Sequence, residues 1–296
     1  MKRDKAVTWQ RVSPAALQLA GQRIAVVGGT GGLGRALARA LAAGGAHVIV
    51  VGRTFRDAGV RNIEFLEADL TTMREADRVA GLIPAETLDS IVFTTGIMAA
   101  PQRQETADGI ERDMAISFLS RLVILRAVAH RLGVGRPAGR ARARVFVMGF
   151  PGAGNVGSLD INAERSYKAM THHMNTVAGN EILVLDAARR YPHLDVFGLN
   201  PGAVSTAIRS NFMGEGSIKH RMLEGVLRLM TPTPETYAGR IAPLLASPGI
   251  SGHSGSMFDR KGDAVLPSDG LTEKYIADYL EASTRLVAKT GVPVAS

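Results

Sequence analysis

Short apolar runs alternate with longer stretches of helical periodicity along most of this 296-residue chain. The apolar runs have strand length, and the longer stretches repeat apolar residues at the three- to four-residue spacing of an amphipathic helix. The predicted strands are 24–27, 47–51, 61–66, 90–94, 144–148, 196–199 and 256–258. The predicted helices are 33–41, 72–82, 109–132, 163–190, 234–245 and 271–289.

Strands that alternate with helices predict an α/β fold, here a Rossmann-type doubly wound parallel sheet in a single domain. Ligands of such sheets bind at the carboxyl ends of the strands. We expect residues 1–20 to form a basic N-terminal extension and residues 21–296 to form the dinucleotide-binding domain. An amphipathic, Met-containing stretch at 218–230 suggests a substrate lid near 205–232, although simple core packing explains that stretch equally well.

The stretch 21–54 reads as strand, glycine turn, helix and second strand, which is a βαβ unit with a nucleotide-binding turn. Glycines let backbone amides approach a pyrophosphate, and the helix N-terminus favours the anion. The turn fits several dinucleotide patterns, among them Gly29-x-Gly31-x-x-Gly34. The turn residues expected to bind the cofactor are Gly28, Thr30, Gly31, Gly32, Leu33 and Gly34.

The end of the second strand indicates which dinucleotide binds. An NAD site typically has a carboxylate there that accepts a hydrogen bond from the ribose 2′-hydroxyl. This strand ends Val51-Gly52-Arg53-Thr54, without an acidic residue. An arginine can hold a 2′-phosphate bidentately. Arg53 therefore favours NADP(H), the alternative being an ordinary surface arginine.

Composition narrows the class of protein further. With 46% hydrophobic residues the chain can bury one large core. The formal charge of the chain is +8, but the sequence contains no recognisable nucleic-acid-binding motif. We therefore assign the positive charge to solvated surface residues, which also favour an anionic cofactor. There is no cysteine, and we predict no metal site. No apolar run reaches membrane-spanning length and the first residues lack a signal-peptide core, so we expect a cytoplasmic protein without stable membrane insertion.

Over roughly residues 20–260 the chain resembles the short-chain dehydrogenase/reductase superfamily, and within it the retinol-dehydrogenase-like branch. The residues that carry this resemblance are Gly28, Gly32 and Gly34 in the turn, Asp69-Leu70, Gly96-Ile97 and the segment 200–206, Asn-Pro-Gly-Ala-Val-Ser-Thr. The resemblance implies that Asp69 and Leu70 contact adenine and that Thr95 and Gly96 lie along the adenosine ribose. It also implies that the loop with Pro201 and Gly202 binds the cofactor, with Val204 and Thr206 at the nicotinamide carboxamide.

The catalytic half departs from the family pattern of Asn, Ser and Tyr-x-x-x-Lys. No Tyr-x-x-x-Lys occurs in the chain, since Tyr167 is followed four residues later by Thr171. The ungapped register of the resemblance places His173 at the position of the catalytic tyrosine and Val177 at that of the lysine. The same register puts Ser117 where the family carries asparagine, and Gly149-Phe150 where it carries serines.

His173 is therefore the first candidate for proton transfer, and Tyr167 is the second. Residues 173, 176, 177, 180 and 184 share one helix face, on which His173 is the titratable group. An imidazole can act as general acid or base near neutral pH without an adjacent lysine. The alternative is a histidine that only packs on the helix beside His172.

Three functions are compatible with these patterns. The first is an atypical NADP(H)-dependent oxidoreductase acting on a carbonyl or alcohol group of a small apolar molecule. The second is a non-redox isomerase, cyclase or lyase on the same fold, and the third is a catalytically inactive NADP(H)-binding regulatory protein. The resemblance also suggests a homodimer or homotetramer formed by the two long helices.

Overall fold

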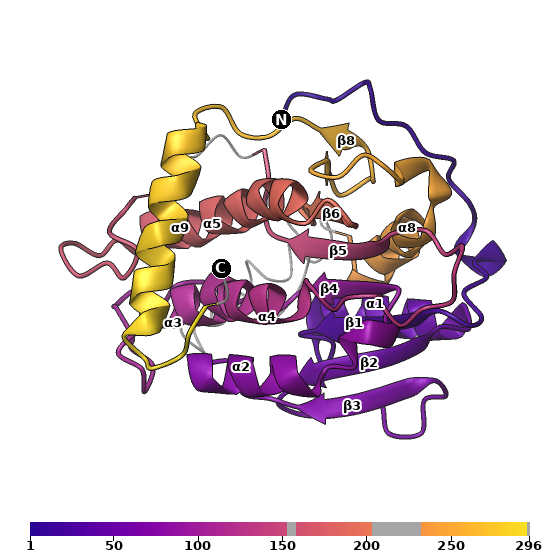
Figure 1. Ribbon diagram of the computed structural model, residues 1–296, viewed down its shortest axis with the longest axis horizontal. Helices are drawn as coiled ribbons and strands as arrows, with labels where there is room; N and C mark the ends of the chain where they lie inside the picture. Colours follow the sequence, from indigo (N-terminus) through magenta and orange to yellow (C-terminus); the bar gives the residue numbers. More distant parts are fainter. Residues whose placement is uncertain (153–157, 203–231, 295–296) are drawn as a thin grey trace, which may run out of the picture.

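In the computed structural model, which describes residues 1–152, 158–202 and 232–294, eight strands form one sheet (Figure 1). The strands are β1 Arg23–Val27, β2 His47–Gly52, β3 Ile63–Glu67, β4 Ser90–Phe93, β5 Ala143–Met148, β6 Leu194–Leu199, β7 Met257–Phe258 and β8 Ala264–Val265. Their order is β3-β2-β1-β4-β5-β6-β7-β8. Every neighbouring pair is parallel except β7 with β8. The predicted doubly wound parallel sheet is confirmed, and the antiparallel strand β8 is an addition that the apolar pattern did not predict.

Helices cover both faces of the sheet (Figure 1). One face packs against α1 (Gly32–Ala43) and α8 (Pro234–Ala246), and receives alternate strand residues such as Val26 and Val50. The other face receives Val27 and Val51. The helices on that face are α2 Met73–Leu82, α3 Arg112–Met114, α4 Ser120–Val128, α5 Ala169–Arg190 and α9 Glu273–Ala288. Because both faces are buried, the central strands are apolar at nearly every position, as expected for a parallel sheet.

The two long helices differ from their predicted bounds. The helix predicted at 109–132 is shorter and interrupted, because residues Ala115–Leu119 between α3 and α4 form a π-helix. The helix predicted from 163 begins only at Ala169. Residue Ala163 has a positive φ of 49°, and the Asp160 carboxylate accepts hydrogen bonds from the backbone N–H groups of the following residues 164 and 165. These local bonds hold the segment as a loop and delay the helix.

The N-terminal residues lie along the last strand of the sheet. Residues 2–4 pair with β8, through hydrogen bonds from Leu266 N to Lys2 O and from Asp4 N to Ala264 O. Further along, the Trp9 indole donates to Gly262 O at 2.7 Å. We refer to residues 1–11 as the N-terminal arm. Within the described ranges, no helix is both long and apolar enough to cross a membrane.

Candidate functional site

The glycine turn after β1 packs tightly against the end of β4. Gly28 has a φ of +91°, and a Cβ atom placed on it would lie 2.5 Å from the backbone nitrogen of Thr95. A Cβ on Gly34 would collide with the carbonyl oxygen of Gly28 and the hydroxyl of Thr94. Only glycine fits at these two positions, since any side chain would push apart the backbone of two neighbouring strands.

The same turn suits a pyrophosphate. Gly31 precedes the first residue of α1, Gly32, so the unpaired N–H groups of the helix N-terminus face the edge where the parallel strands end. The hydroxyl oxygen of Thr95 is buried at this edge and has no hydrogen-bond partner in the part of the chain that the structure describes. A cradle without side chains and an orphaned polar atom fit the dinucleotide expected from the sequence.

The loop after β2 carries a net excess of positive charge. Arg53 is exposed, as a phosphate ligand requires, and Nη1 of Arg56 lies 3.5 Å from the carbonyl oxygen of Thr30 in the glycine turn. A carboxylate does follow in this loop, but Asp57 is buried and is held by Arg35 and Arg39 at distances of 2.8 Å. The hydrogen bonds from Arg35 lower the pKa of Asp57. Asp57 is thus occupied internally, and Arg56 is a candidate that the sequence reasoning missed.

The other predicted cofactor residues lie at strand ends, and part of the set lies outside the described residues. Asp69 is exposed beyond β3, whereas Leu70 is buried. Gly96 follows β4, and the turn Pro201-Gly202 follows β6, with Gly202 N donating to Asn200 Oδ1 at 2.9 Å. Val204, Thr206, nearly all of the predicted lid and the stretch 218–230 lie outside the described residues.

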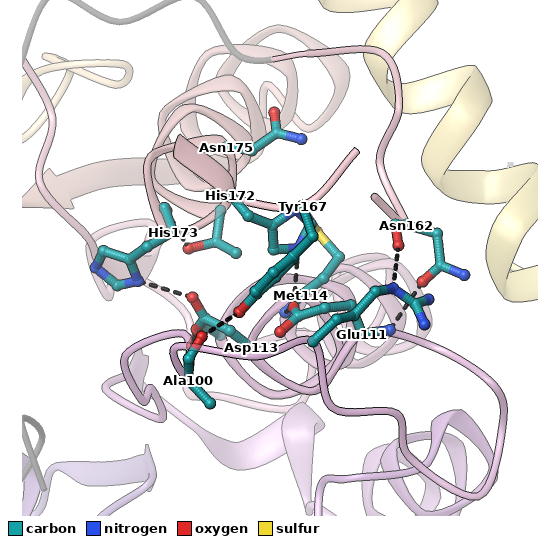
Figure 2. A network of polar contacts seen from close by, with 12 residues as sticks. Ala100, Glu111, Asp113, Met114, Asn162, Tyr167, His172, His173 and Asn175 are labelled. Carbon is teal, nitrogen blue, oxygen red and sulfur yellow. Dashed lines mark hydrogen bonds and ion pairs between the residues drawn. The ribbon is translucent and has the colours of Figure 1, made fainter. Parts of the chain in front are cut away.

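His173 forms a pair with a carboxylate that sequence reasoning did not identify (Figure 2). Its Nδ1 lies 2.7 Å from Oδ2 of Asp113, which is fully buried, while the imidazole itself is 21% exposed. Ser117 donates its hydroxyl proton to Oδ1 of Asp113 at 2.5 Å and accepts from the backbone N–H of Ile97 at 3.0 Å. Because Ile97 follows Gly96, this chain of contacts joins the histidine to the cofactor edge of the sheet.

The pair has the geometry of an acid–base dyad. Burial raises the pKa of Asp113, and the hydrogen bonds from His173 and Ser117 oppose that rise by stabilising the carboxylate. A carboxylate facing Nδ1 requires a proton on that nitrogen, which leaves Nε2 to exchange a proton with a substrate. The only local signal for this partner is the spacing of Asp113 and Ser117, which are four residues apart and share a helix face.

Tyr167 is placed less favourably for proton transfer. Its hydroxyl donates to the carbonyl oxygen of Ala100 at 2.5 Å, and Figure 2 shows it pointing to that residue. Burial, together with the nearby charges of Glu111 and Asp113, raises the pKa of Tyr167 to about 12. The charge of Arg103 opposes this rise without cancelling it, and a tyrosine that holds its proton so tightly is a poor general base at neutral pH. These contacts favour His173 over Tyr167.

A second buried histidine pair supports the first. His172 Nε2 lies 2.8 Å from Oε2 of Glu111, and the same oxygen accepts the backbone N–H of Met114 at 2.8 Å (Figure 2). The backbone N–H of Glu111 donates to Oδ1 of Asn162 at 2.8 Å. Glu111 thereby fixes the start of α3, the short helix that carries Asp113. His172 is consequently a packed residue, and His173 is the one that reaches the surface.

Glycine turn, strand-end residues and sheet order together define a dinucleotide-binding α/β protein. The sequence profile of the short chain dehydrogenase family matches residues 22–215, and the chain belongs to that family. Members of the family are oxidoreductases that bind a nicotinamide cofactor, and this chain is an oxidoreductase of the family.

Individual relatives agree with this assignment. A Saccharomyces cerevisiae protein described as an uncharacterized oxidoreductase is 46% identical over 293 residues, covering 97% of this chain and 95% of the relative. Human retinol dehydrogenase 14 is 25% identical over 276 residues, covering 83% of this chain and 81% of the relative. A solved structure of an uncharacterized protein from Mycobacterium paratuberculosis, 19% identical, superposes with a TM-score of 0.70 over 96% of this chain and 99% of that one. The last comparison concerns the fold alone.

Proposed function

We propose that this protein is an NADP(H)-dependent oxidoreductase that interconverts a carbonyl and an alcohol group of a small apolar molecule, with His173 as its proton-transfer residue. The observation that carries the proposal is the continuous contact path from Ile97, in the segment that follows β4, through Ser117 and Asp113 to His173. This path supports the proposal because it connects the imidazole of His173 to the segment after β4, on the side of the sheet where ligands of such folds bind.

The residues act as follows in the direction of carbonyl reduction. When bound, the nicotinamide would supply the hydride to the carbonyl carbon. Protonated His173 donates the proton on Nε2 to the carbonyl oxygen, which completes the alcohol. Asp113 accepts the hydrogen bond from Nδ1 throughout and stabilises the imidazolium, and Ser117 keeps that carboxylate oriented. In alcohol oxidation neutral His173 accepts the proton instead.

The cofactor preference is part of the proposal and is supported by charge. Arg53 and Arg56 are cations in the loop after β2, and the buried Asp57 is already bound by two arginines. A 2′-phosphate would meet positive charge here, whereas a 2′-hydroxyl would find no available carboxylate.

The apolar character of the substrate is supported by two features. Val177, a buried apolar residue of α5, stands at the position of the family's lysine, so no lysine charge lies at that point of the helix. Retinol, named in the human relative, is an apolar alcohol. A cytoplasmic location and a homodimer or homotetramer formed through the long helices are further parts of the proposal.

The decisive experiment is a turnover screen of the purified full chain. NADPH is mixed with a panel of aliphatic, aromatic and terpenoid aldehydes and ketones, and NADP⁺ with the matching alcohols, while absorbance of the reduced nicotinamide and product mass are recorded. We expect stoichiometric formation of alcohol and NADP⁺ for at least one apolar pair. Tight NADPH binding without any nicotinamide oxidation or reduction across the panel would overturn the proposal.

The screen also separates the two other functions. A panel member that changes structure without net redox change, and only while His173 is intact, would identify a non-redox acid–base enzyme. Binding of NADPH with no chemistry at all would identify a regulatory protein. Both results contradict an oxidoreductase.

A further inference from the structure

Arg121 is a buried cation whose direct partners in the described part of the chain are all neutral oxygens. Its side chain on α4 is 3% exposed. Nη1 donates to the carbonyl oxygen of Met148 and, at 2.7 Å, to Oδ1 of Asn180, and Nη2 donates to the carbonyl oxygen of Thr95. The Nε group has no hydrogen-bond partner among residues 1–152, 158–202 and 232–294. Burying a charge without a hydrogen-bonded carboxylate is costly, so its presence here requires a reason.

The guanidinium lies where the elements of the site converge. Thr95 follows β4, Met148 ends β5 and Asn180 lies on α5, so one side chain ties together three elements. A Cβ placed on Gly96 would lie 3.5 Å from Nη2 of Arg121 and 3.6 Å from the hydroxyl of Ser117. The buried charge therefore sits directly against the turn that is expected to contact the cofactor.

Two hydrogen-bonded arms run from Arg121 to His173. Along α5, the amide of Asn180 donates to the carbonyl of Thr176 at 2.8 Å, and the Thr176 hydroxyl donates to the carbonyl of His173 at 2.8 Å. Along the other arm, the same amide donates to the carbonyl of Ser117 at 2.8 Å, and the Ser117 hydroxyl binds Asp113. Both arms end on the proton-transfer pair.

Charge connects the two ends as well. Burial lowers the pKa of Arg121 to about 9, which leaves it protonated at neutral pH, and the negative charge of Asp113 opposes this lowering. By the same attraction, the cation stabilises the ionised form of Asp113, whose burial would otherwise favour protonation. The other titratable groups near the pair come from the loop before α3, the segment before α5 and α5 itself, and they are Glu111, Tyr167 and His172.

We propose that Arg121 is a positioning residue of the reaction, whose buried positive charge keeps Asp113 ionised and His173 oriented with its proton on Nδ1. The inference rests on the proposed role of His173, but its test needs neither a substrate nor turnover. A negative turnover screen would remove the reaction but leave the effect of Arg121 on the histidine–carboxylate pair measurable, and a negative result here leaves the oxidoreductase proposal intact.

The test is an NMR pH titration of histidine-labelled full-length protein, with the His173 signal assigned from its loss in His173→Gln. In Arg121→Gln a negative charge on Asp113 becomes more costly, so the histidine–carboxylate pair holds its proton to higher pH. We expect the titration midpoint of His173 to rise by about one pH unit. In Arg121→Lys, which keeps the charge, the midpoint should return to within about 0.3 pH units of the parent value.

The matched control is Arg126→Gln. Arg126 is equally buried on the same helix, but it pairs with Asp186 at 2.9 Å, away from His173. This change should lower the melting temperature and leave the midpoint unchanged. Both glutamine variants are measured with and without trimethylamine N-oxide, which favours the folded state. An unchanged midpoint in folded Arg121→Gln, an equal shift in Arg126→Gln, or failure of Arg121→Gln to fold in either buffer would overturn the proposal and leave Arg121 with a structural role alone.

Discussion

The glycine turn and the histidine site are built on opposite principles. In the turn, Gly28 and Gly34 are required because backbone from β4 and from the turn itself fills the space a side chain would need. In the histidine site, the function rests on side chains that support one another over long sequence distances, such as His173 and Asp113. The two glycine positions therefore tolerate no other residue. The acid–base role, in contrast, can be taken by a different residue type, such as histidine, if a charged partner supports it.

The largest effect is expected from removing the imidazole. His173→Gln should lower kcat for a substrate identified in the screen by about 10²–10⁴-fold, because general acid–base catalysis contributes that much. Binding of NADPH, measured by its fluorescence, should stay within about twofold of the parent protein because the variant leaves the glycine turn untouched.

The control for that variant is Tyr167→Phe, which loses one hydrogen bond to Ala100. It should lower the unfolding free energy by about 1 kcal/mol and kcat by less than about tenfold. A larger kcat loss in Tyr167→Phe than in His173→Gln would reassign the proton to the tyrosine.

The steric side is tested by Gly34→Ala. Its methyl group would collide with the Gly28 carbonyl and the Thr94 hydroxyl, so the turn must shift. We expect NADPH binding to weaken about 100-fold and the unfolding free energy to fall by about 1–3 kcal/mol. Gly81→Ala is the control, because a Cβ on this α2 residue meets no atom within 4 Å. Gly81→Ala should leave the unfolding free energy unchanged or raise it by up to about 1 kcal/mol. Unaltered NADPH binding in Gly34→Ala would show that the turn does not hold the cofactor.

A smaller effect is expected for cofactor preference. Arg53→Asp replaces a phosphate ligand by a carboxylate that repels phosphate and attracts a ribose hydroxyl. The ratio of NADH to NADPH dissociation constants should fall by about 10–100-fold, as measured by fluorescence titration. Arg61→Asp is an equally exposed change, but Arg61 precedes the amino end of β3, whereas Arg53 follows the carboxyl end of β2, so this variant should leave the ratio unaltered. An unchanged ratio in Arg53→Asp would remove Arg53 from the site.

The smallest effect concerns stability and its pH dependence. Arg35 and Arg39 lower the pKa of Asp57, so the stability from this cluster is present above the unfolded carboxyl pKa of about 4 and is lost as pH falls through the lower folded value. Asp57→Asn should therefore be about 1–2 kcal/mol less stable than the parent in urea at pH 7, with the gap closing near pH 2–3. The exposed Asp77→Asn should stay within about 0.5 kcal/mol of the parent at either pH. If the difference in unfolding free energy between Asp57→Asn and the parent grew as the pH fell, the ion pairing of Asp57 with Arg35 and Arg39 would be contradicted.

The sequence predicted those features that depend on local pattern. Apolar runs located seven of the eight strands of the described residues. Helical periodicity located α2, which was predicted at 72–82 and spans Met73–Leu82. The strand β8 was missed because it has only two residues and its pairing partner lies in a hairpin. The π-helix at 115–119 was missed because no residue there breaks the helical period.

The candidate site was predictable in its glycines and in His173, but not in the groups that support them. Asp113 lies 60 residues before His173, and Arg121 lies 59 residues before Asn180. Such pairs form only when the fold brings α3, α4 and α5 together, so the spacing of these residues along the chain does not predict them. Helical spacing predicted that residues 176, 177, 180 and 184 share one face, and the structure shows that they are buried. The cation in contact with this face comes from another helix.

The N-terminal arm has a consequence for the order in which the chain assembles. Residues 2–4 are synthesised about 260 residues before β8, the strand with which they pair. During synthesis the arm must therefore wait unpaired until the sheet has reached its final strand. Once docked, it occupies the free edge of β8, the place where an open sheet would otherwise accept a strand from another molecule. Because the arm covers this edge, its deletion should raise aggregation during refolding more than it lowers the free energy of unfolding.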